Sequence, residues 1–211
     1  MIEMINKPWI EEIPVRYTAH KTLEGEQYFV HEMADLGNGA VQVGRYSYIH
    51  GNTRATGNQY LQIGKFCSIA TGVRLHCGDE HDLEHVSTFP FNTILGVELN
   101  YDEVRGGGIV IGNDVWIGEG VRILSGTVIG NGCVLGAGGL VKGCVEPYGI
   151  YGGNPARLIR MRCSAHKISI LNKIGWWDWS LEKIKRNKKF FCAKINSLSD
   201  VEFDKIIKRL E

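Results

Sequence analysis

The chain has 211 residues, with 24 lysines and arginines against 23 aspartates and glutamates. This charge balance offers no basic field for nucleic acid, and no stretch is long and apolar enough to span a membrane, so neither partner is expected. The first residues are rich in glutamate, which argues against a signal peptide, and the cysteines form no C-x-x-C pair, so we expect a reducing cytoplasm and neither disulfides nor zinc.

Residues 1–40 contain no repeat, and we expect an irregular N-terminal lead-in there. Large apolar residues six positions apart then begin with Val43 and Ile49. The spacing pauses over Arg54–Gln59 and resumes with Ile63, Ile69 and Leu75. These residues predict the first coils of a repeating structure.

The same spacing is unbroken over the residues Ile111, Ile117, Ile123, Ile129, Leu135 and Val141. A helix repeats every 3.6 residues and a strand every 2, so a period of six fits neither alone. It fits a hexapeptide β-helix, in which each unit is one short strand and one corner. Glycine directly follows four of these six anchors, and we expect it to supply the positive φ of a sharp corner.

A long segment without the repeat, residues 76–108, separates the two blocks of anchors. A solenoid tolerates such an insertion because each coil contacts only its neighbours. Ordered loops of this length are usually functional. The segment contains His81 and His85, so we expect it to carry chemistry.

The chain leaves the repeat after Val145, and residues 161–211 predict a helical segment. Ser164, Ser180 and Ser199 are plausible N-caps, and Ser199 with Glu202 fits a capping box. We expect these helices to pack over the end or side of the prism and to hide its strand edges.

Five short motifs occur in one order along the chain. They are Ile63–Ile69 (IGKFCSI), Ser87–Phe91 (STFPF), Ile111–Gly118 (IGNDVWIG), Gly152–Ala156 (GGNPA) and Trp176–Trp179 (WWDW). Together they resemble the hexapeptide-repeat acyltransferases, and within them the xenobiotic acetyltransferase group. This group includes type B chloramphenicol and streptogramin acetyltransferases and many sugar O-acetyltransferases.

The resemblance implies a mainly β chain with a left-handed parallel β-helix over residues 41–160, carrying the loop 76–108, and C-terminal α-helices over 161–211. It implies a homotrimer with acetyl-CoA between neighbouring prisms, no metal, and a loop histidine as general base. An imidazole suits that role because it changes charge near neutral pH. His81, nine residues before Pro90, is the expected base, and His85 is the alternative.

The same resemblance suggests a cofactor site near the end of the repeat. The expected cofactor-binding residues are Trp116, Gly136, Ala137, Lys142, Asn154, Pro155, Arg157 and Arg160. The tryptophan would lie near the thioester, and the small residues would leave room for the pantetheine arm. The three cations suit the CoA phosphates. His20, His31, His50 and His166 have no chemical setting in the sequence.

The acceptor is less constrained than the donor. Drug-modifying members carry a longer insertion where this chain has only Arg54–Gln59, which favours a saccharide or other small alcohol. An antibiotic of the chloramphenicol or streptogramin type is the alternative. A third hypothesis for the function is a non-catalytic trimeric scaffold, which the presence of His81 disfavours. A zinc hydrolase of the γ-carbonic anhydrase type is disfavoured because the repeats contain too few histidines.

Overall fold

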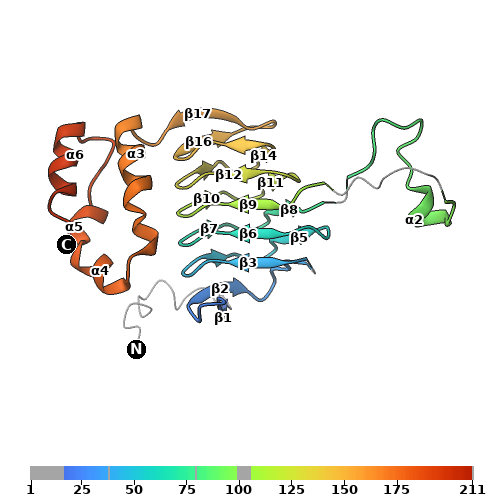
Figure 1. Cartoon of the computed structure of the whole chain (residues 1–211), viewed down its shortest axis with the longest axis horizontal. Coiled ribbons are helices and arrows are strands. Elements are labelled where there is room, and N and C mark those ends of the chain that lie inside the picture. Colours follow the sequence, from blue (N-terminus) through green and yellow to red (C-terminus); the bar gives the residue numbers. More distant parts are fainter. Residues whose placement is uncertain (1–16, 38, 79, 99–105, 211) are drawn as a thin grey trace.

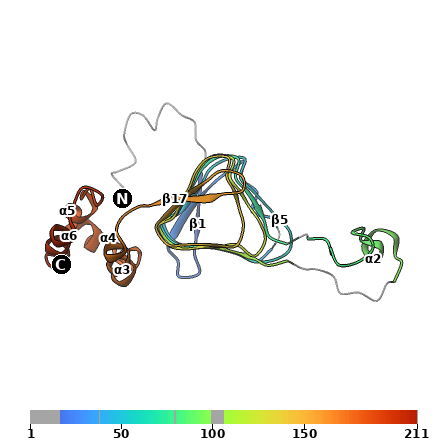
Figure 2. The same ribbon diagram turned by 90° about the horizontal axis from the view of Figure 1, so that it is seen from above.

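A computed structural model of the chain describes residues 17–37, 39–78, 80–98 and 106–210. The described strands form three sheets, which are the faces of a triangular prism seen end-on in Figure 2. Sheet A contains β1 (Tyr17–Lys21), β2 (Gln27–His31), β4 (Tyr48–Ile49), β7 (Ser68–Ile69), β10 (Trp116–Ile117), β13 (Val134–Leu135), β16 (Gly149–Gly152) and β17 (Arg157–Met161). Sheet B contains β5 (Arg54–Thr56), β8 (Arg74–His76), β11 (Arg122–Ile123) and β14 (Leu140–Val141). Sheet C contains β3 (Val41–Val43), β6 (Leu61–Ile63), β9 (Ile109–Ile111), β12 (Val128–Ile129) and β15 (Cys144–Val145).

Each coil of the prism crosses sheet A, sheet B and sheet C in turn, so the coils stack along one axis (Figure 1). Strands of successive coils pair in parallel: Ile69 lies beside Ile117, and Ile117 lies beside Leu135. The predicted parallel β-helix is therefore confirmed.

The six-residue period corresponds to the packed interior of the prism. All six anchors from Ile111 to Val141 are at most 2% exposed. Burial of each large aliphatic side chain contributes about 1.5–3 kcal/mol. The smaller residues four positions later, such as Thr127 and Cys133, are also buried and fill the space between anchors.

The glycines that follow the anchors have a different role from the predicted one. Positive φ occurs three residues after the anchor, for example at Gly126 and at the non-glycine Asp114. An added Cβ at Gly64 would lie only 2.4 Å from the carbonyl oxygen of Gly112 in the next coil. These glycines are required because neighbouring coils approach closely, so the expectation of positive φ was wrong.

The N-terminal segment is more regular than predicted. Inside the expected irregular lead-in, β1 and β2 form an antiparallel hairpin, and β2 pairs in parallel with β4. The Thr22 amide donates to the Glu26 carbonyl at 2.7 Å, which closes the turn. These strands lack the six-residue period because they precede the first complete coil.

The expected pause over Arg54–Gln59 also contains a strand. β5 pairs with β8, and Ala55 is buried opposite Leu75. Alanine is too small to stand out as an anchor, so the pattern of large apolar residues is interrupted there although the coil is not. The coil continues through this segment, with a bend only at residues 57–59.

The insertion between β8 and β9 projects away from the prism, as Figures 1 and 2 both show. Its described part carries α2 (Phe91–Leu95). Leu83, Val86, Ile94 and Leu95 on this loop are largely exposed.

The C-terminal helices are α3 (Ala165–Ile174), η1 (Trp176–Asp178), α4 (Leu181–Arg186), α5 (Lys188–Phe191) and α6 (Asp200–Ile207). The three predicted N-caps are confirmed, including the capping box of Ser199 and Glu202. Leu171, Phe190 and Phe203 form a second core with Tyr148 of the last coil.

The helices lie beside one side of the prism rather than over its ends (Figure 1). The outer edges of sheet A are instead occupied by the antiparallel strands β1 and β17. Arg45 ties the helices to an early coil, because its guanidinium donates to the carbonyls of Trp177 at 2.9 Å and Trp179 at 2.6 Å. It also forms an ion pair with Glu26.

Candidate functional site

The outer face of sheet A carries a continuous row of side chains, which we call the outer column. Its members come one position before each buried anchor, so the parallel register stacks them. They are Phe29, Tyr48, Ser68, Trp116, Val134 and Ile150, and β17 extends the row with Arg160. Aromatic residues therefore lie toward one end of this face and an arginine lies at the other.

A second row, which we call the corner column, runs one position after the anchors, where the chain turns from sheet A into sheet B. It consists of His31, His50, Ala70, Gly118, Gly136 and Gly152, followed by Arg157 of β17. Main-chain hydrogen bonds hold it: the Gly118 amide donates to the Leu135 carbonyl, and the Gly136 amide donates to the Tyr151 carbonyl. The middle of this column, at Ala70, Gly118 and Gly136, has almost no side chains, and we call this stretch the track.

Trp116 and Arg160, two of the predicted cofactor-binding residues, line one pocket of about 450 Å³. Trp116 is 57% exposed, so it projects from the face rather than packing in the core. Asp114 also lines the pocket and pairs with Arg162 at 3.1 Å. Burial raises the pKa of the Asp114 carboxyl, and the nearby Arg162 guanidinium opposes that shift.

The predicted residues Gly136, Ala137, Asn154 and Pro155 lie at the corner between sheets A and B. The Leu140 amide donates to the Gly153 carbonyl at 3.0 Å, which brings the loop before β17 against this corner. Ala137, Asn154 and Pro155 are exposed there.

The three predicted phosphate-binding cations do not all share one face. Arg157 and Arg160 belong to β17 and lie three residues apart on sheet A. Lys142 follows β14 of sheet B, where the chain turns toward sheet C. The structure thus brings the two arginines together with the sheet A columns and leaves Lys142 apart from them.

His81 lies on the projecting loop with its ring exposed. Its Nδ1 is 2.7 Å from the carbonyl oxygen of Thr88. A carbonyl only accepts, so Nδ1 carries the proton and Nε2 keeps the lone pair that a base needs. The Nδ1 of His85 instead pairs with the Asp82 carboxylate at 2.8 Å.

The loop and sheet A lie on different sides of the same prism. The loop leaves from the side of β8 and β5, whereas β10 and β17 lie toward the helices (Figures 1 and 2). His81 and Trp116 of one chain are therefore not brought into a single site.

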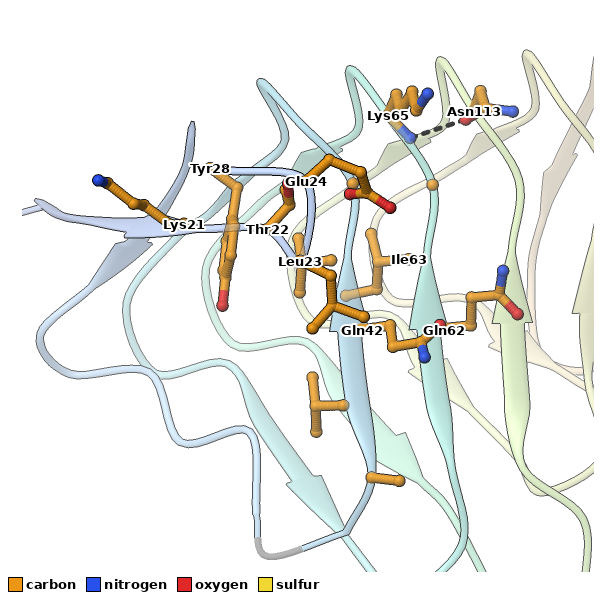
Figure 3. Close-up of a pocket in the computed structure, with 15 residues that line it drawn as sticks. Lys21, Thr22, Leu23, Glu24, Tyr28, Gln42, Gln62, Ile63, Lys65 and Asn113 are labelled. Carbon is orange, nitrogen blue, oxygen red and sulfur yellow. Dashed lines mark hydrogen bonds between the residues drawn. The ribbon is translucent and has the colours of Figure 1, made fainter. Parts of the chain in front are cut away.

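A second pocket of about 450 Å³ lies on the outer face of sheet C, under the turn between β1 and β2 (Figure 3). Gln42 and Gln62 from neighbouring strands project into it, and the Lys65 amide donates to Asn113 Oδ1 at its rim. None of the site residues predicted from the sequence lines this pocket.

Comparison with known proteins identifies the family. A model described as bacterial transferase hexapeptide (six repeats) matches residues 108–143. A chloramphenicol acetyltransferase from Escherichia coli is 42% identical over 176 residues, which cover 74% of this chain and 84% of that protein. The chain belongs to the hexapeptide-repeat acetyltransferases.

This acetyltransferase is also 45% identical over 140 residues to a probable macrolide acetyltransferase from Lysinibacillus sphaericus, which covers 64% of this chain and 78% of that protein. AntD, an N-acyltransferase from Bacillus cereus solved with dTDP and 3-hydroxybutyryl-CoA, superposes with a TM-score of 0.53 at 22% identity. The match covers 69% of this chain and 85% of AntD and shows the shared fold.

Among the residues that the structure describes, no group of His, Cys, Asp and Glu is arranged to hold a metal ion. No helix within the described ranges has the length and apolarity needed to cross a membrane. Cys67 and Cys133 are buried free thiols, and burial raises their pKa to about 12 and about 11.

Four residues of the acetyltransferase drew no functional prediction from the sequence but cluster on sheet A. They are Tyr17, His31, Tyr48 and His50, whose rings contact one another. The six-residue register alone indicates the location of two of them, Tyr48 and His50. Tyr48 and Trp116 both precede an anchor, and His50 occupies the same position as Gly118.

Proposed function

We propose that this acetyltransferase transfers the acetyl group of acetyl-CoA directly to a hydroxyl of a saccharide or other small acceptor, with His81 as general base. The contact of His81 Nδ1 with the Thr88 carbonyl carries this proposal. It leaves Nε2 unprotonated in the neutral ring, in the state that can accept a proton.

Acetyl-CoA supplies an acetyl group activated as a thioester. His81 Nε2 takes the proton of the acceptor hydroxyl as its oxygen bonds to the carbonyl carbon. The C–S bond then breaks, and the imidazolium returns the proton to the departing thiolate. Such a base contributes typically about 10²–10⁴ in rate. The transfer needs neither a covalent enzyme intermediate nor a metal.

The columns of sheet A support a placement for the donor. Arg157 and Arg160 at one end suit the CoA phosphates, since guanidinium groups bind phosphate in a charge-assisted, often bidentate way. The pantetheine arm would lie along the corner column beside the small residues Gly136 and Ala137, and Trp116 would flank the thioester. Asn154 and Pro155 border the same track.

The proposed site requires more than one copy of the chain. His81 projects from one side of the prism, while Trp116 lies on another, so the loop of one copy must reach sheet A of its neighbour. The exposed apolar side chains of the loop, including Ile94 and Leu95, would be covered by that contact. We therefore propose a homotrimer, as the family resemblance implies, acting in the cytoplasm.

Two acceptor classes have specific support. The coil passes Arg54–Gln59 with only a short bend, which leaves out the wall expected of a drug-modifying member and favours a saccharide. The names of the relatives from Escherichia coli and Lysinibacillus sphaericus favour chloramphenicol or a macrolide as the second candidate.

A thiol-release assay tests the proposal. The protein is incubated with acetyl-CoA and with panels of saccharides and of antibiotics, and free CoA is measured over time. We expect acceptor-dependent release with a saccharide. Release that no alcohol accelerates, together with undetectable binding of acetyl-CoA, would disprove the proposed activity.

A further inference from the structure

Four rings form a compact surface at the β1 end of sheet A, which we call the ring platform: Tyr17, His31, Tyr48 and His50. The imidazoles of His31 and His50 are stacked, with centroids 5.8 Å apart and planes 15° from parallel. The Tyr17 ring stands edge-on to both, at 5.6 Å and 5.7 Å. Tyr48 completes the group at 6.5 Å from Tyr17.

The hydrogen bonds of the two imidazoles determine what the platform offers to a ligand. His31 Nδ1 accepts from the Met33 amide at 3.0 Å, and His50 Nδ1 accepts from the Gly51 amide at 3.1 Å. Each neutral ring therefore carries its proton on Nε2, the reverse of His81. Neither Nε2 has a hydrogen-bond partner among the described residues, so both are donors available to a ligand.

The tyrosines add flat apolar faces with polar ends. Burial, and to a lesser degree the neighbouring Tyr48, raises the pKa of the Tyr17 hydroxyl, so it remains a protonated donor at neutral pH. Donors interleaved with flat rings match a ligand with many oxygens and an apolar face, which describes a sugar ring. A purely apolar ligand would leave these donors unpaired, at a cost.

The register places the platform at a defined position relative to the proposed donor site. Tyr48, Ser68 and Trp116 are successive members of the outer column. Neighbouring strands are separated by about 4.8 Å, so Tyr48 lies about 10 Å from Trp116 along the sheet. His31 and His50 begin the same corner column that ends at Arg157, so the platform and the arginines lie at its opposite ends.

We propose that the ring platform binds the acceptor, and that this acceptor is a saccharide of two or more rings. The inference rests on the proposed function, because the reacting hydroxyl must lie near Trp116 while the platform holds a more distant part of the same molecule. A single sugar ring cannot occupy both places.

The test compares acceptors of different length. Turnover with acetyl-CoA is measured for mono-, di- and trisaccharides of hexoses, N-acetylhexosamines and hexuronic acids, with chloramphenicol as the drug arm. We expect kcat/KM to be about 10-fold higher for a di- or trisaccharide than for its monosaccharide, as one or two additional contacts provide. The variants His31→Ala and Tyr48→Ala should each remove most of this gain and leave the affinity for acetyl-CoA unchanged.

Gln62→Ala is the matched control, because it removes an exposed polar side chain from sheet C in the pocket of Figure 3. It should leave the gain with acceptor length intact. If Gln62→Ala removes that gain and the platform variants do not, the acceptor lies on sheet C and the inference is wrong.

The remaining outcomes separate the inference from the proposed function. Acetylation of chloramphenicol without any saccharide turnover would overturn the saccharide platform and leave the acetyltransferase activity standing. A saccharide turned over equally well at every length would do the same. Failure to bind acetyl-CoA or to acetylate any alcohol would overturn both.

Discussion

His81 and His85 lie four residues apart on one loop, and the Nδ1 atom of each contacts an oxygen acceptor. The acceptor is the Thr88 carbonyl for His81 and the Asp82 carboxylate for His85. Hydrogen bonding by the Glu84 amide, assisted by His85, lowers the pKa of the Asp82 carboxyl, so this partner is ionised at neutral pH. Either acceptor leaves Nε2 of a neutral ring with its lone pair, so the position of His81 nine residues before Pro90 is what selects it as the expected base.

The variant His81→Ala should therefore lower kcat by about 10²-fold or more, in line with the usual contribution of a general base. Affinity for acetyl-CoA, measured by calorimetry, should stay within about twofold because the base acts on the acceptor. His85→Ala serves as the matched loop control and should retain most of the activity. If His85→Ala is inactive and His81→Ala is active, the base is His85 and its assignment to His81 is wrong.

The same role for His81 predicts a pH dependence with a definite sign. Only the neutral imidazole can accept the hydroxyl proton, so turnover should rise with pH across the range in which imidazoles deprotonate. The measurement is kcat/KM for one acceptor from pH 5 to 8 at saturating acetyl-CoA. A flat profile, with the chemical step shown to be rate-limiting, would rule out histidine base catalysis.

Arg157 and Arg160 should each contribute to CoA affinity, since both lie on sheet A at the end of the track. Loss of a charge-assisted hydrogen bond corresponds to roughly 10–150-fold in affinity. Binding of CoA and of dephospho-CoA to Arg157→Ala and Arg160→Ala shows which arginine contacts the 3′-phosphate, because only that variant loses affinity for CoA selectively. Lys142→Ala, on the sheet B side, should have little effect, and a loss equal to that of the arginine variants would argue against the sheet A placement.

At the scale of the strands and corners, the coils depend on glycine for a reason that the period alone does not reveal. An alanine Cβ at Gly64 would meet main-chain atoms of Gly112 and Asn113, which cannot move without breaking the parallel register. At Gly126, by contrast, a Cβ would meet nothing within 4 Å, although φ is +72°.

Gly64→Ala should destabilise the protein by about 3 kcal/mol or more, at the upper end of overpacking costs. Gly126→Ala should lower the free energy of unfolding by only about 1–2 kcal/mol, which is the cost of placing a residue with a side chain in the left-handed conformation. Urea unfolding of both variants, followed by far-UV circular dichroism, compares them directly. Equal midpoints would mean that contact between coils does not restrict Gly64.

The sequence predicts those parts of the fold that repeat and misses those that do not. The anchors were predictable because each is a large aliphatic residue at a fixed spacing, and burial demands that chemistry. Ala55 escaped notice because a small residue can fill an interior position without looking apolar. The hairpin β1–β2 lies outside the repeat, so the period could not predict it. Lys142 and Arg157 are close in sequence but lie on different faces of the prism, because Lys142 follows a strand of sheet B and Arg157 is in a strand of sheet A. The sequence alone does not tell which sheet each segment joins.

The whole molecule raises the question of how one site is assembled from distant parts of the chain. The loop with His81 and the columns of sheet A lie on different sides of the prism (Figure 2). In a closed trimer each loop can meet the sheet of the next copy, which forms equivalent sites.

Light scattering coupled to gel filtration should therefore give the mass of a trimer. A stronger test mixes the inactive variants His81→Ala and Trp116→Ala after denaturation and refolding together. In randomly mixed trimers, about one quarter of the sites combine an intact His81 from one copy with an intact Trp116 from the next. Activity should therefore return to about one quarter of that of the unmodified protein. A monomer at every concentration, or mixtures as inactive as the separate variants, would contradict a site shared between copies.

The strands β1 and β17 also limit the length of the solenoid. A stack of parallel coils ends in unpaired N–H and C=O groups, and these would readily accept the coil of another molecule. Fibre growth by such addition is the usual hazard of identical units stacked along an axis. In sheet A both terminal positions are filled by strands of reversed direction. An incoming coil would meet an antiparallel neighbour in place of the parallel register, so sheet A offers no matching edge for end-to-end addition.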